Sequence, residues 1–341
     1  MEQDPVNFIT KKGYQYLKNS RTALAQYINC NPEDVVCVTN PSYAVNIIAK
    51  GFPLAPGDEV LTTNIEYGAC DKTWKYYCDQ KGATYVQLEV TLPIASKESF
   101  VESFVRSINA NTKLIFISHI TSATALRLPV EEICAIARER GIPTFVDGAH
   151  APAHVPVDMV YLQASIYTGA CHKWMMAPKG ASFLYVDKGL QPLFDPLVIS
   201  WGFQTGLPST EPFIDYHELQ DTRDVAAFCT IPYCIEFMEQ YDWDQVSRRN
   251  RKLVQDNANV LCELLQSPAL APINDDFIGQ MFSCEIKTDN PMQLHDLLYE
   301  KYKIQIPIAV QQDKCYIRYS INAFNDQSDL DRLFDALKDM Y

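Results

Sequence analysis

An acid, an imidazole and an amine follow predicted strands in the central part of the chain. Asp147 and His150 lie in the string VDGAHAPAH, and Lys173 lies in YTGACHKW, each after a run of apolar residues. Because ligands of open α/β sheets bind at the carboxyl ends of the strands, we expect the three side chains to converge on one rim of a sheet. Such a combination could serve many reactions, including nucleophilic catalysis by the amine.

The neighbours of Lys173 favour a reactive amine. Trp174, Met175 and Met176 follow it directly. Desolvation by apolar side chains lowers the pKa of a lysine toward the range in which the neutral amine is a nucleophile. Taken singly, however, a histidine after a strand is more often a satisfied turn residue, and a lysine is more often a surface charge. Neither residue alone therefore indicates an active site.

The elements that must position these residues alternate between strand and helix. We predict strands at residues 35–39, 59–63, 84–88, 113–118, 143–147, 160–167 and 182–186. Between them, the string VEEICAIARER at 130–140 places apolar residues at helical spacing, and the Gly141-Ile142-Pro143 sequence ends that helix before the next strand. The alternation predicts an α/β fold with a mainly parallel sheet covered by helices.

The pattern changes after Pro232. Long, charged helical segments at 233–240 and 246–265 precede a strand, a helix, a second strand and a last helix that ends the chain at 330–341. We therefore predict a large α/β domain at 1–241 and a small C-terminal α+β domain at 242–341.

Composition restricts the kinds of partner. The 341 residues are 47% hydrophobic and 21% charged, which suits a large core, and the net charge of -13 opposes nonspecific binding to nucleic acid or to anionic membranes. No long apolar run and no basic signal region occur, so we expect a soluble, cytoplasmic protein with a small-molecule partner. The eleven cysteines never form a C-x-x-C pair, which predicts reduced thiols and neither a metal site nor a disulfide framework.

The strings VDGAHAPAHVPVD and YTGACHKWMMAPKG resemble the cofactor region of the class V aminotransferase family of fold type I pyridoxal phosphate (PLP) enzymes. The likeness covers nearly the whole chain and is closest to the branch of isopenicillin N epimerase and the cysteine desulfurases. It implies a seven-stranded, mostly parallel sheet with a small C-terminal α+β domain, pyridoxal 5'-phosphate as the cofactor, and a homodimer with active sites at the subunit interface.

The resemblance assigns roles residue by residue. Lys173 matches the lysine that holds PLP as a Schiff base, and Asp147 matches the acid that pairs with the pyridine nitrogen and makes the ring an electron sink. His150 falls where the family places a group near the phenolic oxygen of the cofactor. Tyr67, in TNIEYGA, occupies the position of the ring that stacks on the pyridine. An ordinary core tyrosine is the alternative for Tyr67.

The string VTNPSYAVNIIAKG resembles the first phosphate loop of the family. It implies a phosphate site in which Ser42 supplies a hydroxyl, while Asn40 and Pro41 open a helix whose first amides face the anion. Without the family, the same string indicates only a well-capped helix.

Four further residues match positions that bind cofactor or substrate. His172 matches a phosphate ligand, and Ser122 stands where desulfurases place an asparagine of the cofactor site. Thr222 resembles the threonine that reaches the phosphate of the neighbouring subunit, although Asp221 precedes it where many relatives have glycine. Arg318, in CYIRYSINAFND, matches the arginine that binds the substrate carboxylate through two parallel donors. An arginine on a sheet edge is the alternative.

The resemblance thus implies an enzyme that acts at the α-carbon of an amino acid, with epimerase-like or C–S lyase-like chemistry. Amino transfer at the same site and a noncatalytic dimeric relative are the alternatives. Relatives usually have several dozen residues before the point equivalent to Asp4, so a more open entrance or an altered activity is expected. Cys315 lies inside a strand pattern, and Cys171 lies two residues before Lys173, so neither thiol can make the excursion that sulfur delivery requires. We therefore do not expect a persulfide-forming desulfurase.

Overall fold

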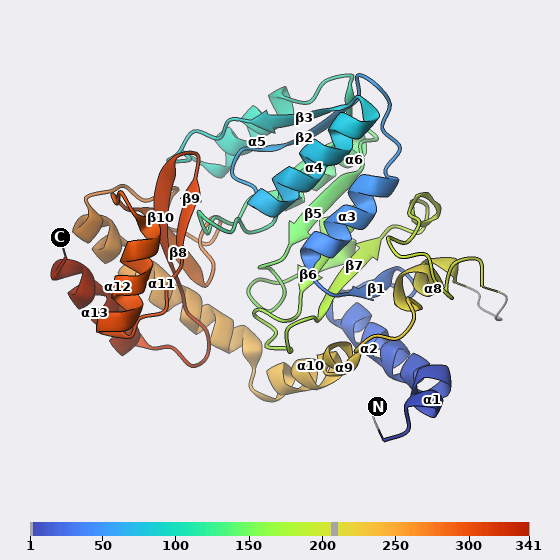
Figure 1. The fold of residues 1–341 in the computed structure, drawn as a ribbon. Helices are drawn as coiled ribbons and strands as arrows, with labels where there is room; N and C mark the ends of the chain where they lie inside the picture. Colours follow the sequence, from blue (N-terminus) through green and yellow to red (C-terminus); the bar gives the residue numbers. More distant parts are fainter. Residues whose placement is uncertain (1–2, 206–210, 341) are drawn as a thin grey trace.

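The computed structural model describes residues 3–205 and 211–340. In these ranges the chain forms a seven-stranded sheet in the order β1, β7, β6, β5, β4, β2, β3 (Figure 1). The strands are β1 Val35–Val38, β2 Glu59–Thr63, β3 Thr84–Leu88, β4 Thr112–Ser118, β5 Thr144–Gly148, β6 Ile166–Ala170 and β7 Ser182–Val186. β7 is antiparallel to β1 and β6, and the pairs from β6 to β3 are parallel. This confirms the predicted fold class.

Helices cover both faces of this sheet, so its central strands are apolar almost throughout. One face packs against α3 (Pro41–Gly51), α4 (Gly68–Lys81) and α8 (Pro212–Glu218), and Figure 1 shows α3 and α4 in front of the strands. The other face packs against α2 (Gly13–Tyr27), α5 (Lys97–Arg106), α6 (Val130–Glu139) and α10 (Ile231–Gln240). The sheet is therefore the middle layer of three.

Local signals fix where the helices begin and end. The Asn40 side chain accepts a hydrogen bond of 2.8 Å from the Tyr43 amide at the start of α3, and Pro41 takes the first helical position, where no amide partner is needed. At the C-terminal end of α4, Gly82 has a φ of 68°, which suits glycine because it has no Cβ. Asn40 and Pro41 thus hold the start of α3 just after β1, at the edge of the sheet.

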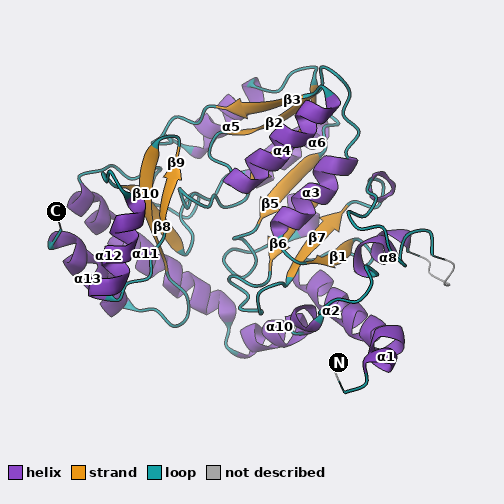
Figure 2. Ribbon diagram, viewed as in Figure 1, coloured by secondary structure: helices purple, strands orange, loops and turns teal. Residues whose placement is uncertain are grey.

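The helix α11 (Trp243–Leu265) leads from the first sheet to a second, antiparallel sheet in the order β8, β10, β9. Figure 2 shows the strands of the two sheets as separate groups. The second sheet comprises β8 Met281–Glu285, β9 Ile308–Gln311 and β10 Lys314–Ser320, with α12 Pro291–Tyr302 and α13 Gln327–Lys338 beside it. The shorter helical segments are α1 Pro5–Asn7, η1 Phe8–Lys12, α7 Met159–Leu162, η2 Gln191–Leu193 and α9 Ala226–Cys229.

We propose the boundary between the two parts at Tyr241/Asp242, directly before α11, and call them the large unit and the small unit. Within the described ranges, no helix combines the length and the apolar composition that crossing a bilayer requires.

Two sequence predictions were wrong in detail. The strand predicted at 160–167 is split, because the Asp158 side chain accepts a hydrogen bond from the Tyr161 amide and starts the short helix α7, which ends at Gln163 with a φ of 54°. The single strand predicted before the last helix is the hairpin β9–β10, which turns at Gln312 and Asp313 with φ of 51° and 60°. Both errors concern short local turns, which periodicity alone does not locate.

Candidate active site

A cavity of about 310 Å³ lies where the ends of β4 and β5 meet the start of α3. Nine of the predicted site residues line it: Asn40, Pro41, Ser42, Tyr67, Ser122, Asp147, His150, His172 and Lys173. These residues are spread over more than a hundred positions of sequence, and the parallel strand order brings them to one edge of the sheet. The predicted convergence is therefore present.

Lys173 and His150 are in direct contact. The Lys173 Nζ lies 3.1 Å from the His150 Nε2, and the Trp174 indole N–H donates to the His150 Nδ1 at 3.5 Å. Burial lowers the pKa of Lys173 to about 8, although Asp147 acts in the opposite direction. Burial, with Lys173 nearby, also holds the pKa of His150 well below its ordinary value. We assign the His150 proton to Nε2, since Nδ1 accepts from the indole; His150 can then donate to the neutral amine.

The Asp147 carboxylate is buried and can accept further hydrogen bonds. Its Oδ1 accepts from the Ala149 amide at 3.0 Å, and its Oδ2 accepts from the Cys70 thiol at 3.5 Å. Burial raises the pKa of Asp147, while the Ala149 amide and the Lys173 charge lower it. A carboxylate with four lone-pair sites and few donors can bind a further N–H group.

Arg318 borders this cavity from the small unit without being among its lining residues. It projects from β10, and its Nη1 donates to the Ser122 backbone oxygen and, at 3.4 Å, to the Ser122 Oγ. Its Nε is buried and has no hydrogen-bond partner in the described structure. A guanidinium that is held on one side only can donate hydrogen bonds to a carboxylate on the other side.

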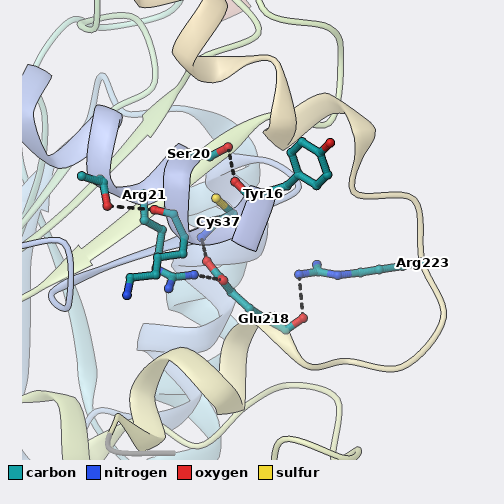
Figure 3. A network of polar contacts seen from close by, with 8 residues as sticks. Tyr16, Ser20, Arg21, Cys37, Glu218 and Arg223 are labelled. Carbon is teal, nitrogen blue, oxygen red and sulfur yellow. Dashed lines mark hydrogen bonds and ion pairs between the residues drawn. The ribbon is translucent and has the colours of Figure 1, made fainter. Parts of the chain in front are cut away.

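A buried ion pair fixes the chain that leads toward Thr222 (Figure 3). The Glu218 carboxylate pairs with Arg21 of α2 and accepts from the Cys37 amide of β1 at 3.0 Å. The Glu218 backbone oxygen accepts from the Arg223 guanidinium at 3.2 Å. Through its carboxylate and its backbone oxygen, Glu218 therefore connects α2, β1 and the segment after α8.

Thr222 itself does not line the cavity of its own chain. Its side chain is exposed, and its Oγ1 donates to the Asp221 Oδ1 at 3.3 Å. The same segment contacts the start of α3 through Gln220, whose Oε1 accepts from the Tyr43 hydroxyl at 3.3 Å. The structure thus places Thr222 near the predicted phosphate loop but outside the cavity.

Sequence reasoning missed several lining residues, and two of them had a signal. Cys70 lies three positions after Tyr67 and so shares its face of α4, while Ser118 ends β4 directly beside Asp147 in the strand register. Behind Ser118 lies the buried Glu66, which accepts from the Ser118 amide at 2.9 Å; burial raises its pKa to about 8. The remaining unpredicted lining residues are Ile120 and Ala149.

The family profile of the class V aminotransferases matches residues 6–333. The chain belongs to the class V aminotransferase family. It is 28% identical over 354 residues to isopenicillin N epimerase of Amycolatopsis lactamdurans, covering 100% of this chain and 89% of that protein. It is 26% identical over 359 residues to L-cysteine desulfhydrase of Arabidopsis thaliana, covering 94% and 78%.

Solved structures share this fold at lower identity. The apo cysteine desulfurase of Thermococcus onnurineus NA1 superposes with a TM-score of 0.82 at 20% identity, covering 96% of this chain and 84% of that one. The cystine C–S lyase C-DES, in complex with its product cysteine persulfide, gives a TM-score of 0.82 at 21% identity, covering 96% and 87%. These likenesses confirm the fold type I architecture.

The family confirms the predicted cofactor and enzyme class: class V aminotransferase-family members are PLP enzymes, and another C-DES structure carries glycine linked to its PLP cofactor. The cavity fits this group on its own chemistry. An amine with a lowered pKa suits the aldehyde, a buried carboxylate with open acceptor sites suits the pyridine nitrogen, and the start of the 11-residue helix α3 suits the phosphate.

Proposed function

We propose that this chain removes the α-proton of an amino acid bound with PLP, and that the product is the epimer or the product of C–S cleavage. The observation that supports this most is the part-buried contact of 3.1 Å between the Lys173 Nζ and the His150 Nε2. An amine whose pKa is about 8 loses its proton close to neutral pH. It can therefore anchor the cofactor and, once displaced by substrate, accept the α-proton.

Three residues would hold the cofactor ring. Lys173 would bind its aldehyde carbon, and Asp147 would hold the proton on the pyridine nitrogen, since burial makes this carboxylate more basic. Tyr67 lines the same cavity and would cover one face of the ring. When bound, PLP supplies an electron sink for the α-carbon bond that breaks.

The phosphate would lie at the start of α3, beside Ser42 and His172. The His172 Nδ1 lies 2.8 Å from the Ala181 backbone oxygen, so Nδ1 carries a proton and turns Nε2 toward other partners. Nε2 can donate to a phosphate only when the ring is doubly protonated. The nearby dianion would favour that form.

Arg318 would bind the substrate carboxylate. Its Nη1 is fixed by Ser122, and the buried Nε is left for a carboxylate oxygen. Because Arg318 belongs to the small unit and Lys173 to the large unit, the substrate would contact both. This arrangement would orient the α-carbon toward the Lys173 amine.

The test is a screen of amino acids with the purified holoenzyme. Loss of optical purity indicates epimerisation; release of pyruvate or another keto acid together with sulfide indicates C–S cleavage; keto acid formation that depends on an acceptor keto acid indicates amino transfer. We expect one of the first two. Dependence of all turnover on an acceptor keto acid would show that the proposal is wrong.

Borohydride reduction tests the anchor separately. We expect the reduced cofactor on Lys173, in the yellow holoenzyme that loses its visible band on reduction. Lys179, six residues later and exposed, is the matched control: Lys179→Ala should keep the band and Lys173→Ala should lose it. A label on Lys179 would remove Lys173 from its proposed role.

We also propose a homodimer in which Thr222 reaches the phosphate site of the partner. The support is a set of exposed large apolar side chains at the N-terminal helices and in the loop before α8: Val6, Ile9, Tyr14, Tyr16, Val198, Ile199 and Trp201. Large apolar side chains exposed on neighbouring elements favour a protein partner. Light scattering should give twice the chain mass, and Thr222→Ala should weaken PLP binding. A monomeric holoenzyme would exclude this arrangement.

A further inference from the structure

Two thiols of the small unit lie within reach of each other. The Sγ of Cys284, on β8, lies 4.0 Å from the Sγ of Cys262, on α11, and all eleven cysteines of the chain are free. A disulfide joins sulfurs at about 2.05 Å. An approach of the two sulfurs by roughly 2 Å would therefore join them.

We propose that Cys262 and Cys284 are a redox modification site that closes to an internal disulfide when an oxidant such as hydrogen peroxide is present. The site lies outside the PLP cavity and does not depend on the reaction proposed for that cavity. It also agrees with free thiols at rest, because reducing compartments keep such pairs open.

The two cysteines suit different steps of the oxidation. Cys262 is half-buried and is the thiol that an oxidant can reach, whereas Cys284 is fully buried. Peroxide would oxidise the Cys262 sulfur to a sulfenic acid and release water. The Cys284 thiolate would then attack the Cys262 sulfur, so that the S–S bond forms and the S–O bond breaks. The departing hydroxide combines with the proton that Cys284 had released and gives a second water. The two sulfurs together lose two electrons, which reduce the peroxide.

The local contacts favour Cys284 as the attacking thiol. The contact between the two sulfurs lowers the pKa of Cys284 and raises the pKa of Cys262, so Cys284 is the more acidic thiol of the pair. A thiol with a lowered pKa is present as thiolate more often, and the thiolate is the form that attacks.

The bond would close a loop that carries the contacts between the two units. Between Cys262 and Cys284, the Leu270 backbone oxygen accepts from the Ile94 amide at 2.8 Å, and the Phe277 backbone oxygen accepts from the Arg127 amide at 2.9 Å. Cross-linking both ends of this segment reduces its freedom in the open state. Oxidation would therefore stabilise the docking of the small unit on the large unit.

The cross-link would also act next to the substrate arginine. Ser283, the neighbour of Cys284, pairs with Arg318 across the second sheet. The Ser283 hydroxyl donates to the Ala123 backbone oxygen at 2.7 Å, one residue after the Ser122 that holds Arg318. A fixed β8 would hold this contact in place.

The experiment treats the purified holoenzyme with hydrogen peroxide, blocks remaining thiols by alkylation and maps peptides without reduction. No lysine or arginine lies between 253 and 286, so trypsin releases both cysteines in one peptide, 253–287. In the oxidised form this peptide should be lighter by two hydrogen atoms and carry no alkyl group. Further cleavage after Glu263 should leave its two halves joined until reductant is added.

Variants separate this site from general oxidation. Cys262→Ser and Cys284→Ser should each abolish the cross-link, whereas Cys315→Ser should keep it; Cys315 is the matched control because it lies half-buried in the same sheet. Peroxide should raise the melting temperature of the wild-type protein and of Cys315→Ser, and not that of Cys284→Ser. A cross-link that includes Cys315, or peroxide treatment that oxidises Cys262 without joining it to Cys284, would overturn the proposal.

Discussion

Replacement of Asp147 by asparagine should separate catalysis from folding. The side chain is 4% exposed and would face the cation of the cofactor ring. Opposite unit charges about 4 Å apart contribute roughly 4 kcal/mol at an effective dielectric constant of about 20. Since each 1.36 kcal/mol corresponds to a factor of about ten, we expect turnover to fall by about 10³. The measurement is steady-state turnover on the substrate that the screen identifies.

The apo protein should respond in the opposite direction. Burial raises the folded-state pKa of Asp147 above its unfolded value of about 3.9, so ionisation costs stability as the pH rises through that interval, and the cost persists at pH 7. Asparagine keeps the shape, and its oxygen can still accept from the Ala149 amide. The melting temperature of apo Asp147→Asn at pH 7 should therefore equal or exceed that of the wild type.

Asp71 is the matched control for this variant. It is also an acid whose pKa burial raises, but it lies outside the cavity, where its Oδ1 accepts from Tyr85 and Gln87. Asp71→Asn should keep normal turnover. Turnover within a few-fold of wild type in Asp147→Asn, or an equal loss in both variants, would refute the role of Asp147.

Three further outcomes follow from the geometry. The rate of PLP incorporation into the apo protein should rise with pH and reach half its maximum near pH 8, because only the neutral Lys173 amine attacks the aldehyde. Stopped-flow absorbance measures this rate, and a flat profile from pH 6 to 9 would contradict Lys173 as the attacking amine. Arg21→Met should lower the free energy of unfolding in urea by about 3 to 5 kcal/mol by leaving the Glu218 charge buried and unpaired, and adding Glu218→Gln should restore most of it. Gly148→Ala should lower the melting temperature strongly, because a Cβ there would lie 2.0 Å from the Tyr167 hydroxyl oxygen; an unchanged value would show that Tyr167 can move.

The sequence contained the fold and most of the cavity because both follow from regular patterns. Strands such as β2 and β7 were predicted to the residue, since turn signals bound their apolar runs on both sides. Asp147 and Lys173 were placed together by the rule that strand ends share an edge. Cys70 was missed because the chemistry of a lone thiol gave no reason to apply helical spacing to it.

Other features depend on contacts that no local pattern carries. The bond between Arg318 and Ser122 joins residues 196 positions apart, so it requires the docking of one unit on the other. The approach of Cys262 to Cys284 depends on how α11 packs on β8, and neither residue lies in a spacing that signals a pair. Thr222 was matched by resemblance alone, and its exposed position is informative only with a second subunit in mind.

The scattered origin of the cavity links cofactor supply to the survival of the fold. Its walls come from the ends of separate strands and from the start of α3, so no contiguous piece of the chain holds them. A ligand that binds only the assembled sheet stabilises it by mass action, by about 2.7 kcal/mol at a hundredfold excess over the dissociation constant. In cells short of PLP, more of this protein would therefore be in the apo form, which unfolds and is degraded more readily. The abundance of the protein would then follow the cofactor level even at constant synthesis.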